Sequence, residues 1–173
     1  MSRRVIFSSL CAMLAFCGAP QIFASEGFLV PAPFQAAIFK EVCREFLPQL
    51  VASKITIVES PEARALATEF QRAQFDVDIV PESQILQNDA PVVYVHPDVS
   101  EETLRKLADS GAFLLTGNQA LVTRGLAAIG IVMNGDRASL VTHISQLEKS
   151  GLRVGLGLFR YAAVLDSPQF SQF

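Results

Sequence analysis

The chain of 173 residues has no tryptophan, only two histidines and only three cysteines. No His, Cys, Asp and Glu residues occur together at the spacing of a metal site, which needs three or four protein ligands. The 14 basic residues are outnumbered by 17 acidic ones and form no cluster. This balance argues against nucleic acid as a partner. The composition also gives no reason to expect a cofactor.

Common signatures of an enzyme are missing as well. There is no Gly-x-Ser-x-Gly nucleophile elbow. The segment Gly155-Leu156-Gly157 lacks the fuller glycine pattern of a phosphate-binding loop. Asp76 and Asp78 lie two residues apart on an expected strand, so both side chains point to one side and resemble a solvated face. We therefore expect a protein that is not an enzyme.

A long apolar run occurs only at the N-terminus. Two arginines precede the run Val5–Ala19, and Ala24 is a small residue suited to cleavage before Ser25. This layout is typical of a cleaved secretory signal peptide, because a run of about 15 residues is shorter than the roughly 20 that span a bilayer. An uncleaved membrane anchor stays open as an alternative, as does a lipoprotein that carries its lipid on Cys17.

Residues 25–173 are then expected to form the mature protein. These 149 residues are enough for one domain with its own core. Loss of two arginines leaves 12 basic against 17 acidic residues, a net charge of about −5. No second apolar run is long enough to span a membrane, so we expect a soluble protein in the periplasm. Cys43 is the one cysteine left, which excludes an internal disulfide and predicts a buried, unreactive thiol.

Alternating helices and strands predict an α/β fold. Apolar residues at helical spacing predict a helix that starts near Pro33 and ends near Pro48. Two more helices are expected, one over Glu62–Gln74 with Ser60 as its cap and one capped by Ser100. Strands rich in β-branched residues are expected at Lys54–Val58, Phe75–Val80 (near a sheet edge), Ala90–Val95 and Ala112–Leu115, with a connection at Glu82–Asp89. Crossovers of this kind place the strands in parallel.

A hairpin is expected to follow. A strand led by Gly125 should turn at Asn134-Gly135-Asp136 and return through Arg137–Ile144, because Asn-Gly suits a type I′ turn. The expected register places Ile131 opposite Ala138 and Ile129 opposite Leu140, so that one face is apolar. The predicted fold class is α/β, a single three-layer sandwich with a mixed, mostly parallel sheet and a C-terminal antiparallel hairpin.

A candidate ligand site follows from this fold, because ligands collect at the carboxyl ends of parallel strands. Ser60 and Ser100 each precede a helix whose backbone N–H groups could hold an anion. The candidate residues at these strand ends are Ser60, His96, Ser100, Thr116, Gly117 and Asn118. In the alternative interpretation the serines are only helix caps, Thr-Gly-Asn is an ordinary turn, and both His96 and His143 are structural.

The order of elements over residues 113–165 resembles the C-terminal half of the YfiR-like periplasmic proteins. The resemblance depends on the Thr116-Gly117-Asn118 segment, the hairpin, and Gly151-Leu152 before a closing apolar stretch. Ala36–Phe39, Ile55–Val58 and Val92–Val95 also occur in the order of that family. The segment Glu45–Gln49 departs from it, because many relatives carry a tryptophan there, and so does the absence of paired cysteines in the mature chain.

The resemblance implies a periplasmic regulator without catalytic residues that restrains a membrane-bound partner. Such a partner would be the extracytoplasmic domain of an inner-membrane signalling protein, for example a diguanylate cyclase. The alternative hypothesis is a periplasmic protein that binds a small anionic solute, and a homodimer is open under either. Exposed apolar or aromatic residues are expected to form the partner surface, with candidates in the N-terminal helix and at Phe159, Tyr161 and Phe170. For Phe159 and Tyr161 a place in the core is an equal alternative.

Overall fold

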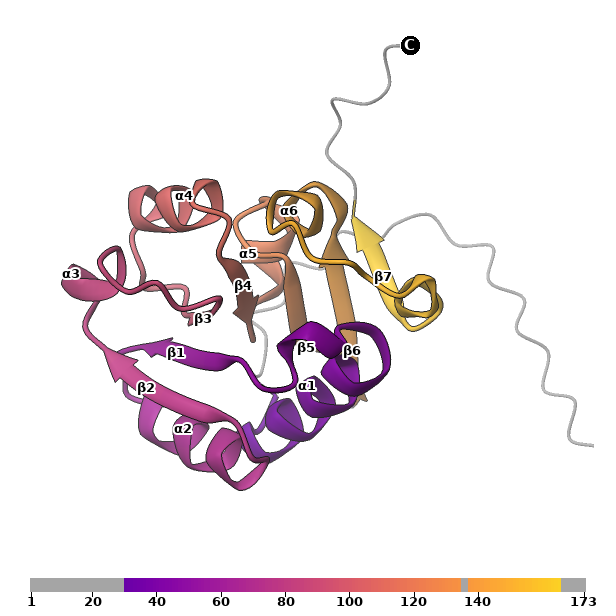
Figure 1. Cartoon of the computed structure of the whole chain (residues 1–173), viewed down its shortest axis with the longest axis horizontal. Helices are drawn as coiled ribbons and strands as arrows, with labels where there is room; N and C mark the ends of the chain where they lie inside the picture. Colours follow the sequence, from indigo (N-terminus) through magenta and orange to yellow (C-terminus); the bar gives the residue numbers. More distant parts are fainter. Residues whose placement is uncertain (1–29, 135–136, 166–173) are drawn as a thin grey trace, which may run out of the picture.

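The computed structural model describes residues 30–134 and 137–165 (Figure 1). They form one seven-stranded sheet with the strand order β2-β1-β3-β4-β5-β6-β7. The first five strands are parallel, and their bounds are β1 Lys54–Val58, β2 Asp76–Val80, β3 Val92–Val95, β4 Phe113–Thr116 and β5 Ile129–Asn134. β6 (Arg137–His143) is antiparallel to β5, and β7 (Ala162–Leu165) is parallel to β6.

Helices cover both faces of the sheet and make it the middle of three layers (Figure 1). α1 (Ala32–Phe46), the 3-10 turn η1 (Pro48–Leu50) and α2 (Ala63–Arg72) pack on one face. α3 (Glu82–Ile85), α4 (Glu101–Asp109) and α5 (Gln119–Thr123) pack on the other. α6 (Ile144–Lys149) contacts α4, and a second 3-10 turn, η2 (Leu156–Arg160), precedes β7. The predicted three-layer α/β sandwich with a mixed, mostly parallel sheet is therefore confirmed.

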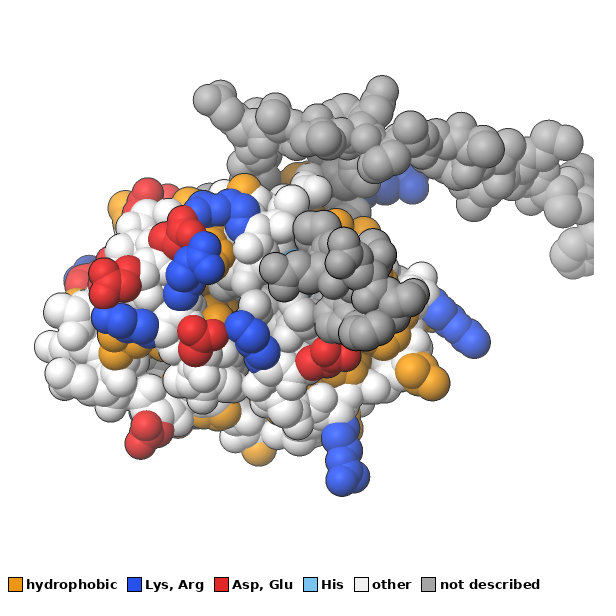
Figure 2. Space-filling view, turned by 90° about the horizontal axis from the view of Figure 1, so that it is seen from above, with side chains coloured by type: hydrophobic (Ala, Val, Ile, Leu, Met, Phe, Trp, Pro, Cys, Tyr) orange, Lys and Arg blue, Asp and Glu red, His pale blue; other side chains and the backbone are white. Residues whose placement is uncertain are grey.

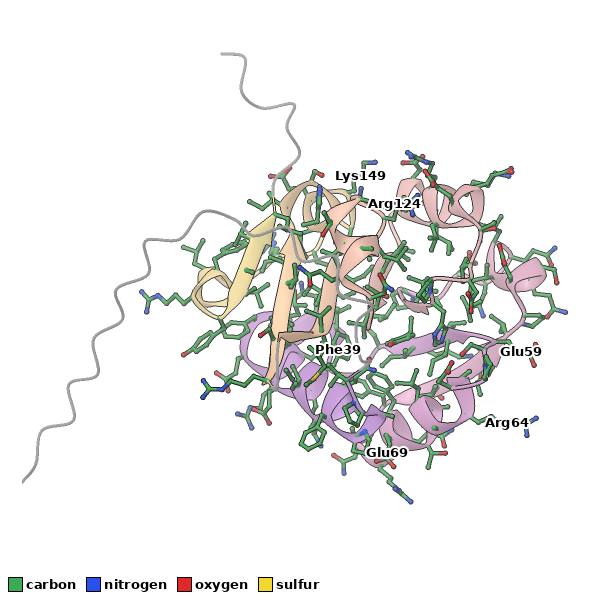
Figure 3. The ribbon with its side chains drawn as sticks, turned by 180° about the vertical axis from the view of Figure 1, so that it is seen from behind. Phe39, Glu59, Arg64, Glu69, Arg124 and Lys149 are labelled. Atoms are coloured by element: carbon green, nitrogen blue, oxygen red, sulfur yellow. The ribbon has the colours of Figure 1, made fainter. Side chains whose placement is uncertain are left out.

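Each face of the sheet has its own apolar core because the central strands are buried on both sides. On the α1 face, Phe39 points from the helix into the interior (Figure 3). Its ring lies 5.9 Å from Phe70, 5.5 Å from Phe75 and 6.4 Å from Phe113, measured between centroids. This cluster joins α1 to α2 and to β4, and so fixes where α1 lies on the sheet.

The hairpin forms, but its register differs from the expected one. Asn134 pairs with Arg137, so Ile131 lies opposite Leu140 and Met133 opposite Ala138. The expected pairing of Ile131 with Ala138 was wrong, since a loop of two residues between 134 and 137 shifts every partner by two positions. A shift of two residues leaves each side chain on the same face of the sheet, so one face of the hairpin is still apolar. The type I′ turn was expected at Asn134-Gly135, but Asn134 belongs to β5, and Gly135 lies outside the described residues.

Three further features correct the expected elements. The hairpin strand starts at Ile129 rather than at Gly125, since α5 and a turn with Gly125 at φ 65° come first. The expected connection at Glu82–Asp89 begins with the short helix α3. The closing apolar stretch contains the edge strand β7, which the sequence pattern did not reveal. The bounds of β1 are those expected, and the expected edge strand β2 does lie at one edge.

Candidate functional site

The structure brings two of the predicted site residues into direct contact. Ser60 follows β1 and His96 follows β3, and the Ser60 Oγ lies 2.9 Å from the His96 Nε2. β1 and β3 are neighbours in the sheet, but the chain leaves β1 towards β2 on one side and leaves β3 towards β4 on the other. This reversal is the topological switch point, where doubly wound sheets open a crevice at their carboxyl edge.

The environment of His96 favours its neutral form. The side chain is only 6% exposed, and its ring centroid lies 5.1 Å from that of Tyr94. Burial lowers the pKa of His96 below its ordinary value of 6.5, although the carboxylates of Glu62 and Asp98 act in the opposite direction. In the described part of the chain, no carboxylate is hydrogen-bonded to His96, so Ser60 and His96 form a pair rather than a Ser-His-Asp triad.

A second polar contact lies next to this pair and was not predicted. The Tyr94 hydroxyl donates to the Gln35 Oε1 at 2.7 Å, and the Gln35 Nε2 donates to the carbonyl oxygen of Val30 at 2.7 Å. Burial raises the pKa of Tyr94 to about 12, although its hydrogen bonds with Gln35 and the Gly117 backbone act in the opposite direction. A side chain on Gly117 would place its Cβ 2.7 Å from the Tyr94 hydroxyl, so glycine is needed for this close approach. The only sequence signal was a tyrosine within the otherwise aliphatic strand Val92–Val95.

The other predicted residues have local structural roles. Ser100 caps α4 as expected, since its Oγ accepts from the Thr103 N–H, and it also donates to the Glu82 carboxylate at 2.6 Å. These hydrogen bonds lower the pKa of Glu82. Thr116 donates to the Val95 carbonyl, and Asn118 caps α5. These residues do not join the Ser60–His96 pair.

Ser60 does not cap α2, contrary to expectation. The helix starts at Ala63, its first turn has no side-chain cap, and only the backbone carbonyl of Ser60 receives a hydrogen bond, from the Ala63 N–H. The hydroxyl of Ser60 is therefore available to His96.

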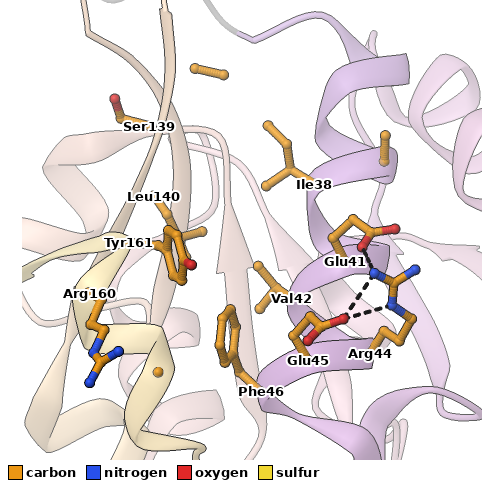
Figure 4. A pocket seen from close by; sticks show the side chains of 13 residues that line it. Ile38, Glu41, Val42, Arg44, Glu45, Phe46, Ser139, Leu140, Arg160 and Tyr161 are labelled. Carbon is orange, nitrogen blue, oxygen red and sulfur yellow. Dashed lines mark hydrogen bonds and ion pairs between the residues drawn. The ribbon is translucent and has the colours of Figure 1, made fainter. Parts of the chain in front are cut away.

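A groove lies elsewhere, between α1 and the start of β6 (Figure 4). The groove has a volume of about 770 Å³. Ile38, Val42 and Phe46 form its α1 wall, and Leu140 lies on the opposite side with Tyr161. The sequence did not predict this groove.

The groove is held open by contacts between the end of α1 and the segment before η2. The Gly155 N–H donates to the Phe46 carbonyl at 2.9 Å, and the Gln49 side chain donates to the Arg153 carbonyl at 2.8 Å. A Cβ on Gly157 would lie 2.8 Å from the Phe46 ring, so the close approach of the two segments depends on this glycine. These contacts set the distance between the two walls.

Charged side chains stand at the rim of the apolar groove. On α1, Arg44 forms ion pairs with Glu41 at 2.5 Å and with Glu45 at 2.9 Å (Figure 4). Arg160 of η2 lines the other side. Aromatic, aliphatic and arginine side chains together are the combination that is enriched at the centres of protein interfaces.

Exposed apolar side chains continue from the groove along η2 and β7. Leu156 is 83% exposed, Tyr161 73% and Val164 42%, and Phe159 is also exposed. Half of the eight exposed large hydrophobic residues thus fall within nine consecutive residues, among the residues described. We refer to Leu156, Phe159, Tyr161 and Val164 as the η2–β7 patch. The sequence left open whether Phe159 and Tyr161 belong to the core or to the surface, and the structure exposes both. Phe170 lies outside the described residues.

Other parts of the surface have a different character. Over α4, acidic and basic side chains alternate (Figure 2). Glu101 pairs with Arg105 and Arg124, and Glu102 pairs with Lys106. The charges over α4 are therefore paired with one another, as on an ordinary solvated surface.

Two kinds of feature do not occur in the described residues. No group of three or more His, Cys, Asp and Glu residues is placed to hold a metal ion within residues 30–134 and 137–165. Within the same ranges, no helix has the length and apolar character needed to cross a membrane.

Comparison with known proteins relates the chain to solved structures only. No protein-family model matches the sequence, and no curated protein does. A conserved domain protein from Vibrio cholerae O1 biovar El Tor has a similar structure, with a TM-score of 0.60 and 11% identity over 79% of this chain. An ABC domain from Streptococcus pneumoniae, solved in complex with L-Trp, has a TM-score of 0.55 and 11% identity over 78% of this chain. The chain spans 60% and 62% of these two proteins, and identities this low indicate a shared fold alone.

Proposed function

We propose that this protein is a non-enzymatic regulator of YfiR-like type, which binds and restrains a membrane-bound signalling protein. The observation that carries the proposal is the apolar groove between α1 and β6, which continues into the η2–β7 patch. A partner docked there would contact Phe46, Tyr161 and Arg160, residue types that often contribute most to binding. The partner is the extracytoplasmic domain of an inner-membrane protein such as a diguanylate cyclase.

A protein partner suits this surface better than a small molecule does. A volume of about 770 Å³ is within the range of small-molecule pockets. The exposed side chains of Leu156 and Val164, however, lie on the adjoining η2–β7 patch and would stay in water if only the groove were filled. A larger partner removes both areas from water, and apolar burial is the main favourable term in association.

The proposal is tested by measuring cyclic-di-GMP in cells that lack this protein. We expect a raised level, restored to normal by the wild-type chain and left high by Ala138→Glu, which places a carboxylate beside Leu140 at the groove. Ala138 is exposed, so this variant should fold. Leu156→Glu should weaken restraint as well, and the matched variant Leu86→Glu, which changes an exposed leucine at the end of α3, should restore it fully. Equal restoration by all three variants would exclude the groove and patch as the partner surface.

The site of action is part of the proposal. The predicted signal peptide, residues 1–24, supports export to the periplasm, where the mature protein would be soluble. Cell fractionation should recover a form that begins near Ser25 in the soluble periplasmic pool. Full-length protein in the inner membrane would contradict cleavage.

A second candidate function is the binding of a small anionic solute. It is favoured by the Ser60–His96 contact at the switch point, where ligands of doubly wound sheets bind. The similar domain from Streptococcus pneumoniae was solved with L-Trp, a small solute that carries a carboxylate. Protein purified from its native host should then release one solute per chain on denaturation, as mass spectrometry would show, and deletion should abolish uptake of that solute.

A further inference from the structure

A continuous set of contacts joins the switch point to α1. Ser60 contacts the His96 ring, and that ring packs on Tyr94. The Tyr94 hydroxyl then donates to Gln35, which lies in the first turn of α1. The same helix supplies the α1 wall of the groove through Ile38, Val42 and Phe46.

We propose that His96 is a positioning residue for α1, so that protonation of His96 loosens this helix and weakens partner binding at the groove. This inference rests on the proposed function for its biological consequence. The coupling between His96 and α1 is a separate claim that can be measured without the partner.

Protonation changes what His96 can do at this place. The neutral ring can accept a hydrogen bond from Ser60 at Nε2, but the imidazolium carries N–H groups on both nitrogens and accepts none. The new charge would also be almost fully buried, which is costly unless it is paired. The carboxylates of Glu62 and Asp98 favour the charge electrostatically, but burial is the larger effect on the pKa of His96. The third neighbouring titratable group, the Tyr94 phenol, is neutral near and below pH 7, and burial raises its pKa from 10.0 to about 12.

A charged His96 therefore favours arrangements in which its ring reaches water. Because this ring packs on Tyr94, we expect Tyr94 to move with it. Both polar groups of the Gln35 side chain are already used, one by Tyr94 and the other by the Val30 carbonyl. Gln35 is only 3% exposed, so loss of the Tyr94 contact leaves a buried amide oxygen without a donor. Movement of the first turn of α1 towards water relieves this cost. Gly117 lies against the Tyr94 hydroxyl, so the ring has little room to adjust within the site.

Cys43 provides a native probe of α1. Its side chain faces the core from this helix and is 1% exposed. The full-length chain carrying Cys11→Ser and Cys17→Ser has this thiol alone, whether or not residues 1–24 are removed. Its rate of reaction with 4,4′-dithiodipyridine, which also reacts with thiols in mild acid, is divided by the rate for the unfolded chain at the same pH. The ratio then reports opening of the helix rather than thiol chemistry.

We expect this ratio to rise by about tenfold between about pH 7.5 and about pH 5.5, because proton-linked equilibria change by up to tenfold per pH unit. The rise should be independent of urea at low concentration, as for local opening rather than global unfolding. In His96→Gln, which keeps a polar group for Ser60 but does not titrate, the ratio should change by less than about twofold. His143→Gln, at the one other histidine of the chain, should retain the full rise. Tyr94→Phe should give fast labelling at both pH values, since it removes the hydroxyl that binds Gln35.

A wild-type rise that persists in His96→Gln, or no rise at all, would overturn the coupling. Failure of the proposed function has a different result. If the groove does not bind the partner, the rate of Cys43 labelling still depends on pH because of His96. Only the effect of pH on partner binding is then lost. The two proposals therefore fail independently.

Discussion

The rings of Phe46 and Tyr161 lie 5.8 Å apart, measured between centroids, although one ends α1 and the other precedes β7. Their contact closes one end of the groove (Figure 4). Aromatic pairs of this kind contribute about 0.5–1.5 kcal/mol beyond their buried area. Because both rings line the groove, Phe46 and Tyr161 form an aromatic end that a ligand with apolar groups can contact.

Tyr161→Ala should weaken binding to the groove without unfolding the protein. Anilinonaphthalene sulfonate, a fluorescent dye with an aromatic body and one sulfonate group, can serve as the probe, and its affinity should fall about threefold, the equivalent of about 0.7 kcal/mol. The melting temperature should change little because Tyr161 is mostly exposed. Gly157→Ala should also alter dye binding, since its Cβ displaces the Phe46 ring. Unchanged dye affinity in both variants would show that the dye does not bind at the aromatic end of the groove.

Phe39→Ala should be among the most destabilising substitutions in the chain. Phe39 is fully buried and contacts three other phenylalanine rings. Removal of a buried phenylalanine ring lowers the free energy of unfolding by about 3–5 kcal/mol. Phe34→Ala, on the same helix but exposed, should change it by less than about 0.5 kcal/mol. Urea denaturation monitored by circular dichroism measures the free energy of unfolding of both variants. Similar decreases in the two would mean that α1 packs on the sheet through a different face.

Stability should fall on mild acidification because of His96. Its pKa is lower in the folded protein than the ordinary value of 6.5. Above about pH 6.5 the residue is neutral in both states, and below it the unfolded chain binds a proton that the folded chain does not. The free energy of unfolding should thus decrease as the pH is lowered from about 6.5 to about 5, and His96→Gln should flatten that part of the curve.

Carboxylates affect the free energy of unfolding in a separate range of pH. Glu82, Glu101 and Glu102 have pKa values lowered by hydrogen bonds, so their contribution is present above about pH 4.5 and is lost only below it. Thermal melts in steps of about half a pH unit resolve the two ranges. A wild-type curve that is flat between about pH 6.5 and about pH 5 would contradict the assigned environment of His96.

Cys43 should be unreactive in the folded protein. Burial raises the pKa of this thiol to about 12, so almost no thiolate is present near neutral pH. Reaction with Ellman's reagent at about pH 8 should be slow in the folded protein and immediate in denaturant. A reductant should leave the melting temperature unchanged, because the one described cysteine is a free thiol. Rapid labelling would show that the end of α1 opens readily even at neutral pH.

The sequence predicted the sheet well where each strand has a strong local signal. Lys54–Val58 is rich in β-branched residues, and its bounds were correct. Ser100 caps α4 as predicted because the capping contact lies within three residues. Ala162–Leu165 was missed because four apolar residues do not distinguish a strand from other buried segments.

The candidate site was predicted only in part because its contacts join distant parts of the chain. His96 and Ser60 were both named from their positions at strand ends, but Ser60 was assigned to α2 as a cap. Gln35 was not named, since its bond to Tyr94 spans 59 residues. The groove depends on how α1 lies against η2, which is set by the close approach of Gly155 and Gly157 to Phe46. No local pattern encodes such a contact.

The two edges of the sheet differ in a way that predicts how the protein associates with itself. β2 carries Asp76 and Asp78, and Lys54 pairs with Asp78, so this edge is charged and resists pairing. β7 is the uncharged sequence Ala-Ala-Val-Leu and lies next to the η2–β7 patch. An uncharged edge strand is a template for another strand. A second copy of the chain has the same edge strand, so two β7 strands could pair across a twofold axis.

We therefore expect a dimer that forms through β7, in which the two β7 strands pair in antiparallel orientation. Val164→Lys should shift the protein towards the monomer, because it places a charge on that edge. Ile79→Lys is the matched control, since it changes a similarly exposed β-branched residue on the opposite edge, and it should leave the dimer intact. Sedimentation equilibrium over a range of concentrations measures both. A monomeric wild-type protein at millimolar concentration, or equal dissociation in the two variants, would exclude β7 as the dimer interface and leave this edge to a different partner.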